Sequence, residues 1–208
     1  MTSQTTPNIV IEKINLDRFC EFYEIIVESR KEWFATGMIP QPDLSIDDLE
    51  CMVRAFQILW DKDDTYMFYA IDADISRMVG MVFLNRINRM RQFANLGYSV
   101  RTSRVKQGIA TAAAKLAARY GFERLGLQRI EIVVSIDNIP SLTVAEKLGA
   151  VREGLLRNGM RLHGKPCNAY LYSLIPADLG ITNRATCADS EGNNPRGLRV
   201  FFQRILQK

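Results

Sequence analysis

The sequence predicts a mixed α/β or α+β domain, and three observations lead to this fold class. With 208 residues, of which 47% are hydrophobic and 24% charged, the chain matches one compact domain with a substantial core. Segments that alternate like strands and segments with helical periodicity follow one another along the chain. No internal repeat is present, and the mixed order of the elements places the fold in the α/β or α+β class.

The N-terminal part is predicted to hold one strand and two helices. Residues 8–14 alternate and are rich in β-branched side chains, as in a strand. A helix is expected to follow directly, capped by Asn15 and ending before Gly37. Ser45 and Asp48 form a variant of the capping box and predict a second amphipathic helix. The apolar side of the first helix comprises Phe19, Phe22, Tyr23, Ile26 and Val27.

The middle of the chain is predicted to form an antiparallel meander followed by a helix. Residues 66–73, 78–86 and 93–101 are short runs rich in β-branched or aromatic residues, separated by polar turns. The pattern then changes to an alanine-rich helix over 109–125, which Gly126 ends.

The remaining elements continue the alternation of strands and helices. Residues 128–135 are predicted to form a strand and residues 140–148 a short helix with proline in its first turn. Two further strands are expected over 150–157 and 169–175. The composition becomes polar after Pro176.

The segment 177–208 is predicted to be a C-terminal extension that ends in a short basic amphipathic helix. Its apolar face comprises Leu198, Phe201, Phe202 and Ile205. Such a helix can dock on a membrane surface or on a partner. The plainer alternatives are packing on its own domain or on a second copy of the chain, which would make the protein a homodimer.

Composition excludes several other classes of protein. No apolar run approaches the roughly 18 residues of a membrane span, and the start lacks the order of a signal peptide, so we expect a soluble cytoplasmic protein. The charge of +4 is spread along the chain and gives no strong nucleic-acid signal. The cysteines lie far apart with His163 as the only imidazole, so we expect reduced thiols and no metal site; they are Cys20, Cys51, Cys167 and Cys187.

One strand, loop and helix unit has the pattern of an anion site. The strand ending near Arg101 leads through a loop into the alanine-rich helix, whose first backbone N–H groups are unpaired by the helix itself. Gly108 lets a ligand approach the backbone, Thr111 offers a hydroxyl, and Lys106 adds positive charge. A lone glycine before a helix is also compatible with a plain structural turn. The P-loop and the G-x-G-x-x-G motif are both absent.

A longer stretch carries a more specific pattern, in the order GYSV at 97–100, QGIAT at 107–111, YGFERLGLQRIEI at 120–132, NIPS at 138–141, EKLGA at 146–150 and REGLLR at 152–157. In these motifs and their spacing the chain resembles the GNAT acetyltransferase superfamily. The similarity is to its Rim-type branch, which acetylates the N-termini of ribosomal proteins. It runs over residues 8–176, which we take as the domain.

The resemblance implies a mixed, mostly antiparallel twisted sheet of about seven strands with helices on both faces. It implies acetyl-CoA as co-substrate, with its pantetheine arm between the splayed fourth and fifth strands. Tyr98, Ser99 and Val100 would line that arm, and a backbone N–H of this strand would polarise the thioester. Asn138 would contact the coenzyme, although its alternative role is helix capping. The pyrophosphate would rest on the amides of Lys106, Gln107, Gly108, Ile109, Ala110 and Thr111.

One departure from the superfamily signature lies in this loop. Val105 stands where Gln or Arg is expected, and Lys106 replaces a common glycine. Because backbone N–H groups do most of the work of holding phosphate, we expect weakened rather than abolished coenzyme binding.

The catalytic residues are less clearly marked. By resemblance, Ser141 or Tyr172 protonates the departing sulfur, although Tyr172 equally suits sheet packing. Glu131 is the candidate base, with a solvent-facing strand residue as its alternative reading. Two positions where a carboxylate would help hold Asn95 and Met160 instead. Further candidates, which also read as surface charges, are Glu28 and Glu32.

The missing strong base bears on the acceptor. A protein α-amino group, with a reference pKa of about 7.7 to 8.0, needs less help to deprotonate than a lysine amine near 10.4. We therefore expect an N-terminal amine as acceptor. The alternatives are a small amine, such as a polyamine, an antibiotic or an amino-acid derivative, and a coenzyme A-binding regulatory module without catalysis.

Overall fold

The computed structural model describes residues 7–182. The expected amphipathic helix near the C-terminus and Cys187 lie outside these residues. Within the described part, no helix has both the length and the apolar character needed to cross a membrane. Cys20, Cys51 and Cys167 are free thiols.

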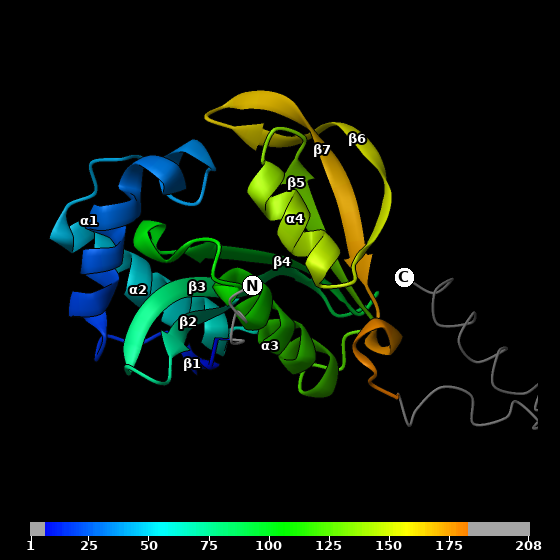
Figure 1. Cartoon of the computed structure of the whole chain (residues 1–208), viewed down its shortest axis with the longest axis horizontal. Coiled ribbons are helices and arrows are strands. Elements are labelled where there is room, and N and C mark those ends of the chain that lie inside the picture. The colour runs from blue at the N-terminus through cyan, green and yellow to red at the C-terminus, as the bar shows by residue number, and fades with distance from the viewer. Residues whose placement is uncertain (1–6, 183–208) are drawn as a thin grey trace, which may run out of the picture.

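A single seven-stranded sheet forms the centre of residues 7–182, in the order β1-β2-β3-β4-β5-β7-β6 (Figure 1). Neighbouring strands are antiparallel except β4 and β5, which are parallel. The predicted mostly antiparallel sheet is confirmed. The strands are β1 (Ile9–Lys13), β2 (Tyr66–Asp72), β3 (Arg77–Asn88), β4 (Phe93–Val100), β5 (Arg129–Ser135), β6 (Val151–Leu162) and β7 (Lys165–Leu174).

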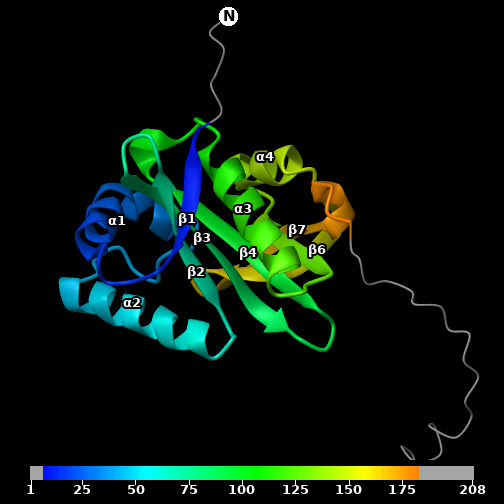
Figure 2. The ribbon, with the colours of Figure 1, turned by 90° about the horizontal axis from the view of Figure 1, so that it is seen from below.

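Helices cover both faces of the sheet, as expected. α1 (Phe19–Ala35) and α2 (Ile46–Asp61) lie on one face, and α3 (Ile109–Glu123) and α4 (Ile139–Lys147) lie on the other (Figure 2). Two short 3₁₀ helices complete the described chain: η1 (Thr102–Arg104) between β4 and α3, and η2 (Pro176–Leu179) after β7.

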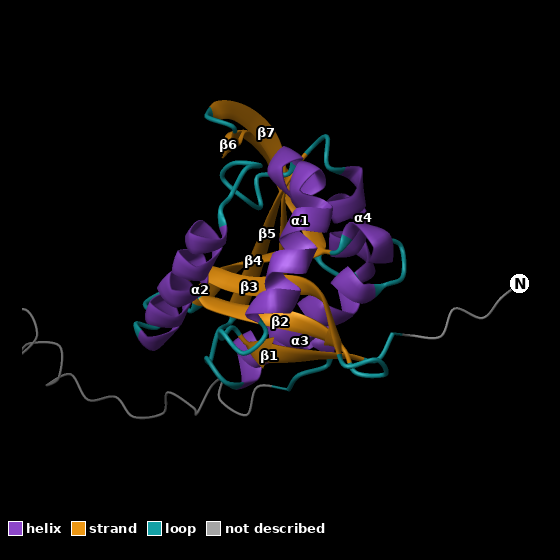
Figure 3. Ribbon diagram, turned by 90° about the vertical axis from the view of Figure 1, so that its left-hand side faces the viewer, coloured by secondary structure: helices purple, strands orange, loops and turns teal. Residues whose placement is uncertain are grey.

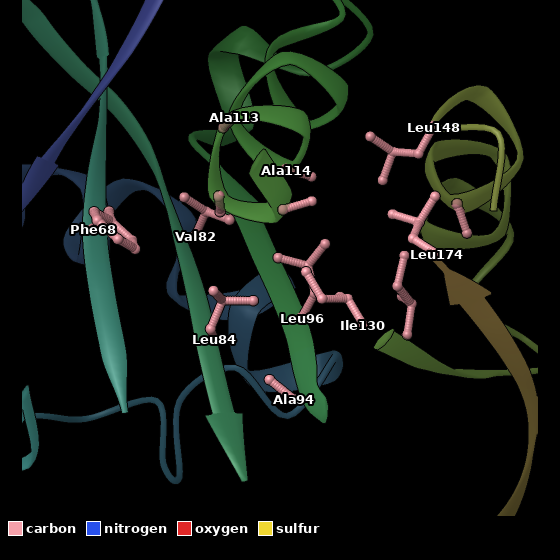
Figure 4. Close-up of a cluster of buried hydrophobic side chains, with 14 of the residues drawn as sticks. Phe68, Val82, Leu84, Ala94, Leu96, Ala113, Ala114, Ile130, Leu148 and Leu174 are labelled. Carbon is pink, nitrogen blue, oxygen red and sulfur yellow. The ribbon is translucent and has the colours of Figure 1, made fainter. Parts of the chain in front are cut away.

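Each face has its own hydrophobic core. On the α3 side, the alanines predicted for this helix let it lie close to the sheet: Ala114 is fully buried near Val82 and Leu96 (Figure 4). On the other side, Phe22 and Trp33 of α1 pack with Tyr69 of β2. The sheet is therefore buried on both faces where the helices cover it.

The predicted start of the first helix is wrong. Asn15 does not cap it, because the side-chain oxygen of Asn15 accepts from the backbone N–H of Asp17 at 2.9 Å and closes a local turn. The helix begins only at Phe19, after Arg18, whose side chain makes no capping bond. Val27, expected on the apolar side, is 47% exposed. The capping box of α2 at Ser45 is confirmed.

The last two strands are longer than predicted. β6 continues to Leu162 and β7 begins at Lys165, so that they form one hairpin with its turn at His163 and Gly164. A register irregularity between Leu156 and Met160 interrupts the alternation from which strands are read. Strand pairing across the hairpin, which the local sequence does not reveal, extends both strands.

Candidate functional site

The parallel strands β4 and β5 pair over three positions only and then diverge. Their last pair is Asn95 with Glu131. Beyond it, β4 remains bonded to β3 as far as Val100, whereas β5 is bonded to β7 as far as Ser135. The fourth and fifth strands therefore splay in the way the sequence resemblance implies.

Tyr98 connects the two sides of this splay. It lies on β4, and its hydroxyl donates to the backbone carbonyl of Ser141 on α4 at 3.0 Å. Burial raises the pKa of Tyr98 well above its usual range. The phenol is therefore neutral at physiological pH and stays a hydrogen-bond donor beside Ser141.

The loop after β4 ends at an uncapped helix N-terminus. The first helical bond of α3 runs from the N–H of Ala112 to the carbonyl of Gly108 at 3.0 Å, so the preceding amides lie before the helical ladder. Gly108 has a φ of 80° and no side chain that could cap them. Lys106, with a φ of 63°, is exposed beside them. This arrangement suits a phosphate-bearing ligand.

Asn138 and Ser141 lie together at the start of α4. The side-chain oxygen of Asn138 accepts from the N–H of Ser141 at 3.2 Å, so Asn138 is the N-cap of this helix. The capping role considered for Asn138 is thus confirmed. Both residues are partly exposed, and the hydroxyl of Tyr98 reaches the backbone of Ser141.

Glu131, the candidate base, lies at the last β4–β5 pair and is engaged in an ion pair. Its carboxylate accepts from the guanidinium of Arg129 at 2.9 Å. Arg129 also binds both oxygens of Glu153, at 2.6 and 2.5 Å, and Ser173 donates to Glu153 at 2.6 Å. The carboxylate of Glu131 is therefore hydrogen-bonded to a guanidinium that it shares with Glu153.

Tyr172, the alternative proton donor, is buried in the sheet. Its side chain is 2% exposed and belongs to the core on the α3 side. Its hydroxyl lies 3.3 Å from a carboxylate oxygen of Glu146, near the opposite end of α4 from Ser141. Desolvation and the charge of Glu146 raise the pKa of Tyr172.

Glu28 and Glu32, the remaining candidate bases, bind the loop after β4 rather than standing free in solvent. Glu28 accepts from Arg101 at 2.6 Å and from the N–H of Ser103 at 2.9 Å. Desolvation would raise the pKa of Glu28, but hydrogen bonds from Ser103 and Arg101 outweigh it and lower the pKa. Glu32 accepts from the hydroxyl of Thr102 at 3.3 Å.

The described residues contain no group of three or more His, Cys, Asp or Glu side chains arranged to hold a metal ion. Three arginines, Arg86, Arg89 and Arg91, lie at the end of β3 and in the β3–β4 turn. Arg89 is bound within the domain, to Tyr66 at 3.0 Å and Asp63 at 3.5 Å.

Comparison with known proteins decides the family. A family model described as Acetyltransferase (GNAT) domain matches residues 9–151, which include the splayed strands, the loop and α4. The chain belongs to the GNAT acetyltransferase family. It is an acetyl-CoA-dependent N-acetyltransferase.

Individual relatives of this GNAT enzyme differ in the acceptor that their names give. The ribosomal-protein-serine acetyltransferase of Escherichia coli (strain K12) is 27% identical over 154 residues, covering 74% of this chain and 84% of the relative. The spermidine N(1)-acetyltransferase of the same organism is 31% identical over 114 residues, covering 53% of this chain and 61% of the relative.

The solved structure of Mycobacterium smegmatis RimJ in complex with CoA-disulfide shares the fold. It has a TM-score of 0.75 and 21% identity, and the match covers 84% of this chain and 85% of RimJ. The GNAT fold expected from the sequence is confirmed.

Several residues around the loop between β4 and α3 (residues 101–108), called the donor loop below, were not predicted from the sequence. The side chain of Tyr98 was assigned to strand lining alone, and Ser29, Trp33, Asp72 and Arg104 were not singled out. Only the role of Ser29 could have been predicted in part, because a serine on the apolar side of a helix needs a hydrogen-bond partner. The partner, the backbone N–H of Thr102, could not have been predicted because it lies 73 residues away in the chain.

Proposed function

We propose that this enzyme transfers the acetyl group of acetyl-CoA to the α-amino group of a protein N-terminus. The amine nitrogen attacks the thioester carbon directly, within a ternary complex. An N–C bond forms and the C–S bond breaks; the amine loses one proton and the thiolate gains one. No covalent enzyme intermediate is needed.

The observation that carries this choice of acceptor is the ion pair of Glu131 with Arg129 at the point where β4 and β5 diverge. Glu28 of α1 likewise forms an ion pair, with Arg101. A carboxylate oxygen that accepts a hydrogen bond from an arginine is less available to take a proton from the attacking amine. An α-amine, with a pKa of about 7.7 to 8.0, is partly unprotonated near neutral pH without such help, whereas a lysine amine near 10.4 is not.

For the donor, we propose that the splay and the loop hold acetyl-CoA. The backbone of Tyr98, Ser99 and Val100 would face the pantetheine and thioester, and an N–H of this strand would stabilise the oxyanion. The amides of residues 106–111 and the charge of Lys106 would bind the pyrophosphate. Asn138 would add a contact to the coenzyme besides its capping role.

We propose that Ser141 donates the proton that the sulfur takes up. Ser141 lies in the first turn of α4, and its backbone carbonyl accepts a hydrogen bond from the hydroxyl of Tyr98 on β4. Tyr172 is the second candidate. It is less favoured because its hydroxyl is directed to Glu146.

A polyamine is the alternative acceptor, and the spermidine-acetylating relative favours it. Two carboxylates of α1 that could attract a polycation are already paired with arginines. Glu21 lies 2.8 Å from Arg18, and Glu24 lies 2.7 Å from Arg77.

The acceptor is tested by incubating the protein and acetyl-CoA with three kinds of amine and following products by mass spectrometry. The amines are peptides with a free N-terminus, the same peptides blocked at the N-terminus but containing lysine, and spermidine. We expect acetylation of the free N-termini, with kcat/KM rising as pH passes through about 7.7 to 8.0. Acetylation of spermidine or lysine in preference to the N-termini would overturn the proposal.

The donor loop is tested with Gly108→Ala, which forces a side chain into a left-handed backbone position. Such strain is worth about 1 to 2 kcal/mol, so we expect the Kd for acetyl-CoA to rise about tenfold. Gly126→Ala is the matched control, because Gly126 has a φ of 68° but lies outside the loop. Equal Kd values for both variants would contradict the assignment of the loop.

A further inference from the structure

One face of α1 is bonded to the chain that leaves β4. The indole N–H of Trp33 donates to the carbonyl of Val100 at 3.1 Å. The hydroxyl oxygen of Ser29 accepts from the N–H of Thr102 at 3.0 Å. Glu28 accepts from the backbone of the following residue, Ser103. Successive turns of α1 thus hold the end of β4 and η1 through main-chain groups.

The burial of these side chains indicates that this contact is specific. Ser29 is 0% exposed and Trp33 is 2% exposed, within an otherwise apolar core. A buried hydroxyl is tolerated there only with a partner, and the N–H of Thr102 supplies one. If Ser29 were alanine, the N–H of Thr102 would be left without this acceptor. The polar atoms of Glu28, Ser29 and Trp33 therefore bind the backbone of residues 100–103.

A second attachment holds the other half of the loop to the sheet. Arg104 donates to the carboxylate of Asp72, the last residue of β2, at 2.6 Å. It also donates to the side chain of Gln107 at 2.8 Å. Asp72 is 7% exposed and the side chain of Arg104 is 28% exposed, so this charge-assisted bond is partly shielded from water.

Between these attachments and α3 the backbone is strained. Lys106 has a φ of 63°, in the left-handed region that non-glycine residues rarely adopt. Such a conformation persists where the surrounding structure enforces it. The bonds at Thr102, Ser103 and Arg104 fix the chain just before Lys106 and provide that enforcement.

We infer that Glu28, Ser29 and Asp72 are positioning residues for the donor loop, which set the affinity for acetyl-CoA without touching it. They hold residues 100–104 so that the amides from Lys106 onward stay ordered toward a phosphate. The inference rests on the proposed assignment of this loop to the pyrophosphate. Figure 3 shows α1 on the near side of the sheet, the side opposite α3 whose N-terminus the loop supplies.

The test measures the Kd for acetyl-CoA by isothermal titration calorimetry, together with steady-state kinetics and melting temperatures. The variants are Ser29→Ala, Glu28→Ala, Glu28→Gln and Asp72→Asn, each in the full chain. Glu50→Gln and Asp61→Asn are matched controls, because these carboxylates form exposed ion pairs far from the loop in sequence, with Arg54 and Lys13.

We expect Ser29→Ala, Glu28→Ala and Asp72→Asn each to raise the Kd and the KM for acetyl-CoA about tenfold, the equivalent of one hydrogen bond. The kcat at saturating acetyl-CoA stays within about twofold of the wild type because the reacting groups are unchanged. Glu28→Gln keeps an acceptor for Ser103 and gives an intermediate Kd. The two controls keep the wild-type Kd.

Three outcomes would overturn the inference. The first is a lower melting temperature with an unchanged Kd, which means that the attachments only stabilise the fold. The second is a fall in kcat with an unchanged Kd, which places Glu28 or Ser29 in the acceptor reaction. The third is a loss of affinity in Gly108→Ala without any loss in these variants: the loop assignment then stands and the positioning role fails. If Gly108→Ala also keeps its affinity, the loop assignment itself fails.

Discussion

At the scale of single residues, the close approach of β3 to β4 at Gly80 determines the position of β4. A Cβ added at Gly80 would lie 2.4 Å from the carbonyl oxygen of Ser99 and 3.2 Å from the Cα of Val100. These are backbone atoms, which cannot move aside without shifting β4. Glycine at this position therefore fixes where β4 lies beside the splay.

Gly80→Ala is expected to destabilise the fold by about 1 to 3 kcal/mol and to raise the KM for acetyl-CoA, since β4 must shift. Urea unfolding and steady-state kinetics measure the two effects. Gly154→Ala is the control, because a Cβ at Gly154 meets no atom within 4 Å. A Gly80→Ala protein with the stability and KM of the control would refute this account.

Asn138 combines two roles that substitution can separate. Asn138→Ala removes the cap of α4 and should lower the free energy of unfolding by about 0.5 to 2 kcal/mol. Asn138→Asp keeps the cap and should retain the stability. If Asn138 also contacts the coenzyme, the added negative charge raises the Kd for acetyl-CoA. An Asp variant with wild-type Kd would leave capping as its sole role.

At the scale of elements, a polar network joins three strands on one face of the sheet. Arg129 of β5 lies between Glu131 on its own strand and Glu153 of β6, and Ser173 of β7 donates to Glu153. Hydrogen bonds from Arg129 and Ser173 lower the pKa of Glu153 to about 2. The network therefore links the exposed edge strand β6 to β5.

This network predicts an acid-dependent contribution to stability. Because the pKa of Glu153 is lowered on folding, its contribution is fully present above the ordinary pKa of 4.5 and is lost as the pH falls toward about 2. Its side chain is 36% exposed, so solvent screening limits the effect to about 1 kcal/mol.

Glu153→Gln should be less stable than the wild type at about pH 6, and the difference should shrink toward about pH 3. Urea unfolding at both pH values measures it. A difference that stays constant or grows on acidification would contradict the network's role.

At the scale of the whole molecule, the sheet consists of two parts joined by few strand bonds. β1 to β4 form one part, β5, β7 and β6 form the other, and three residue pairs of β4 and β5 connect them. α3 and the hydrogen bond from Tyr98 to Ser141 also span the junction. A ligand held between the diverging strands would contact both parts.

Acetyl-CoA is therefore expected to stabilise the enzyme against heat. At a ligand concentration of about 100 times Kd the gain is about 2.7 kcal/mol, provided the unfolded chain does not bind. For a chain of this size that corresponds to a rise in melting temperature of about 5 to 10 °C. Differential scanning fluorimetry measures the shift, and Gly108→Ala should reduce it. No shift at saturating acetyl-CoA would contradict binding across the junction.

Most of the fold was predictable because its elements carry local signals. Helix α2 was predicted from its capping box at Ser45, and α3 from its alanines and the glycine that follows it, Gly126. The boundary of the extension at residue 177 stays a prediction; Leu179 and Ile181, just past it, pack against the core. The predicted start of α1 was wrong, because the residues near Asn15 are compatible both with a helix cap and with a local turn.

The amino-acid sequence was enough to predict the class of fold and the helix start that suits phosphate, because local periodicity and motif spacing encode them. The splayed strands were predicted from the resemblance to the GNAT family. The partners of the charged side chains became known only from the fold: Glu131 with Arg129, Glu28 with Arg101 and Ser103, and Asp72 with Arg104. The physical reason is range. Helical and strand periodicity acts between near neighbours in the chain, whereas the availability of a carboxylate as a base depends on which cation the fold brings within 3 Å.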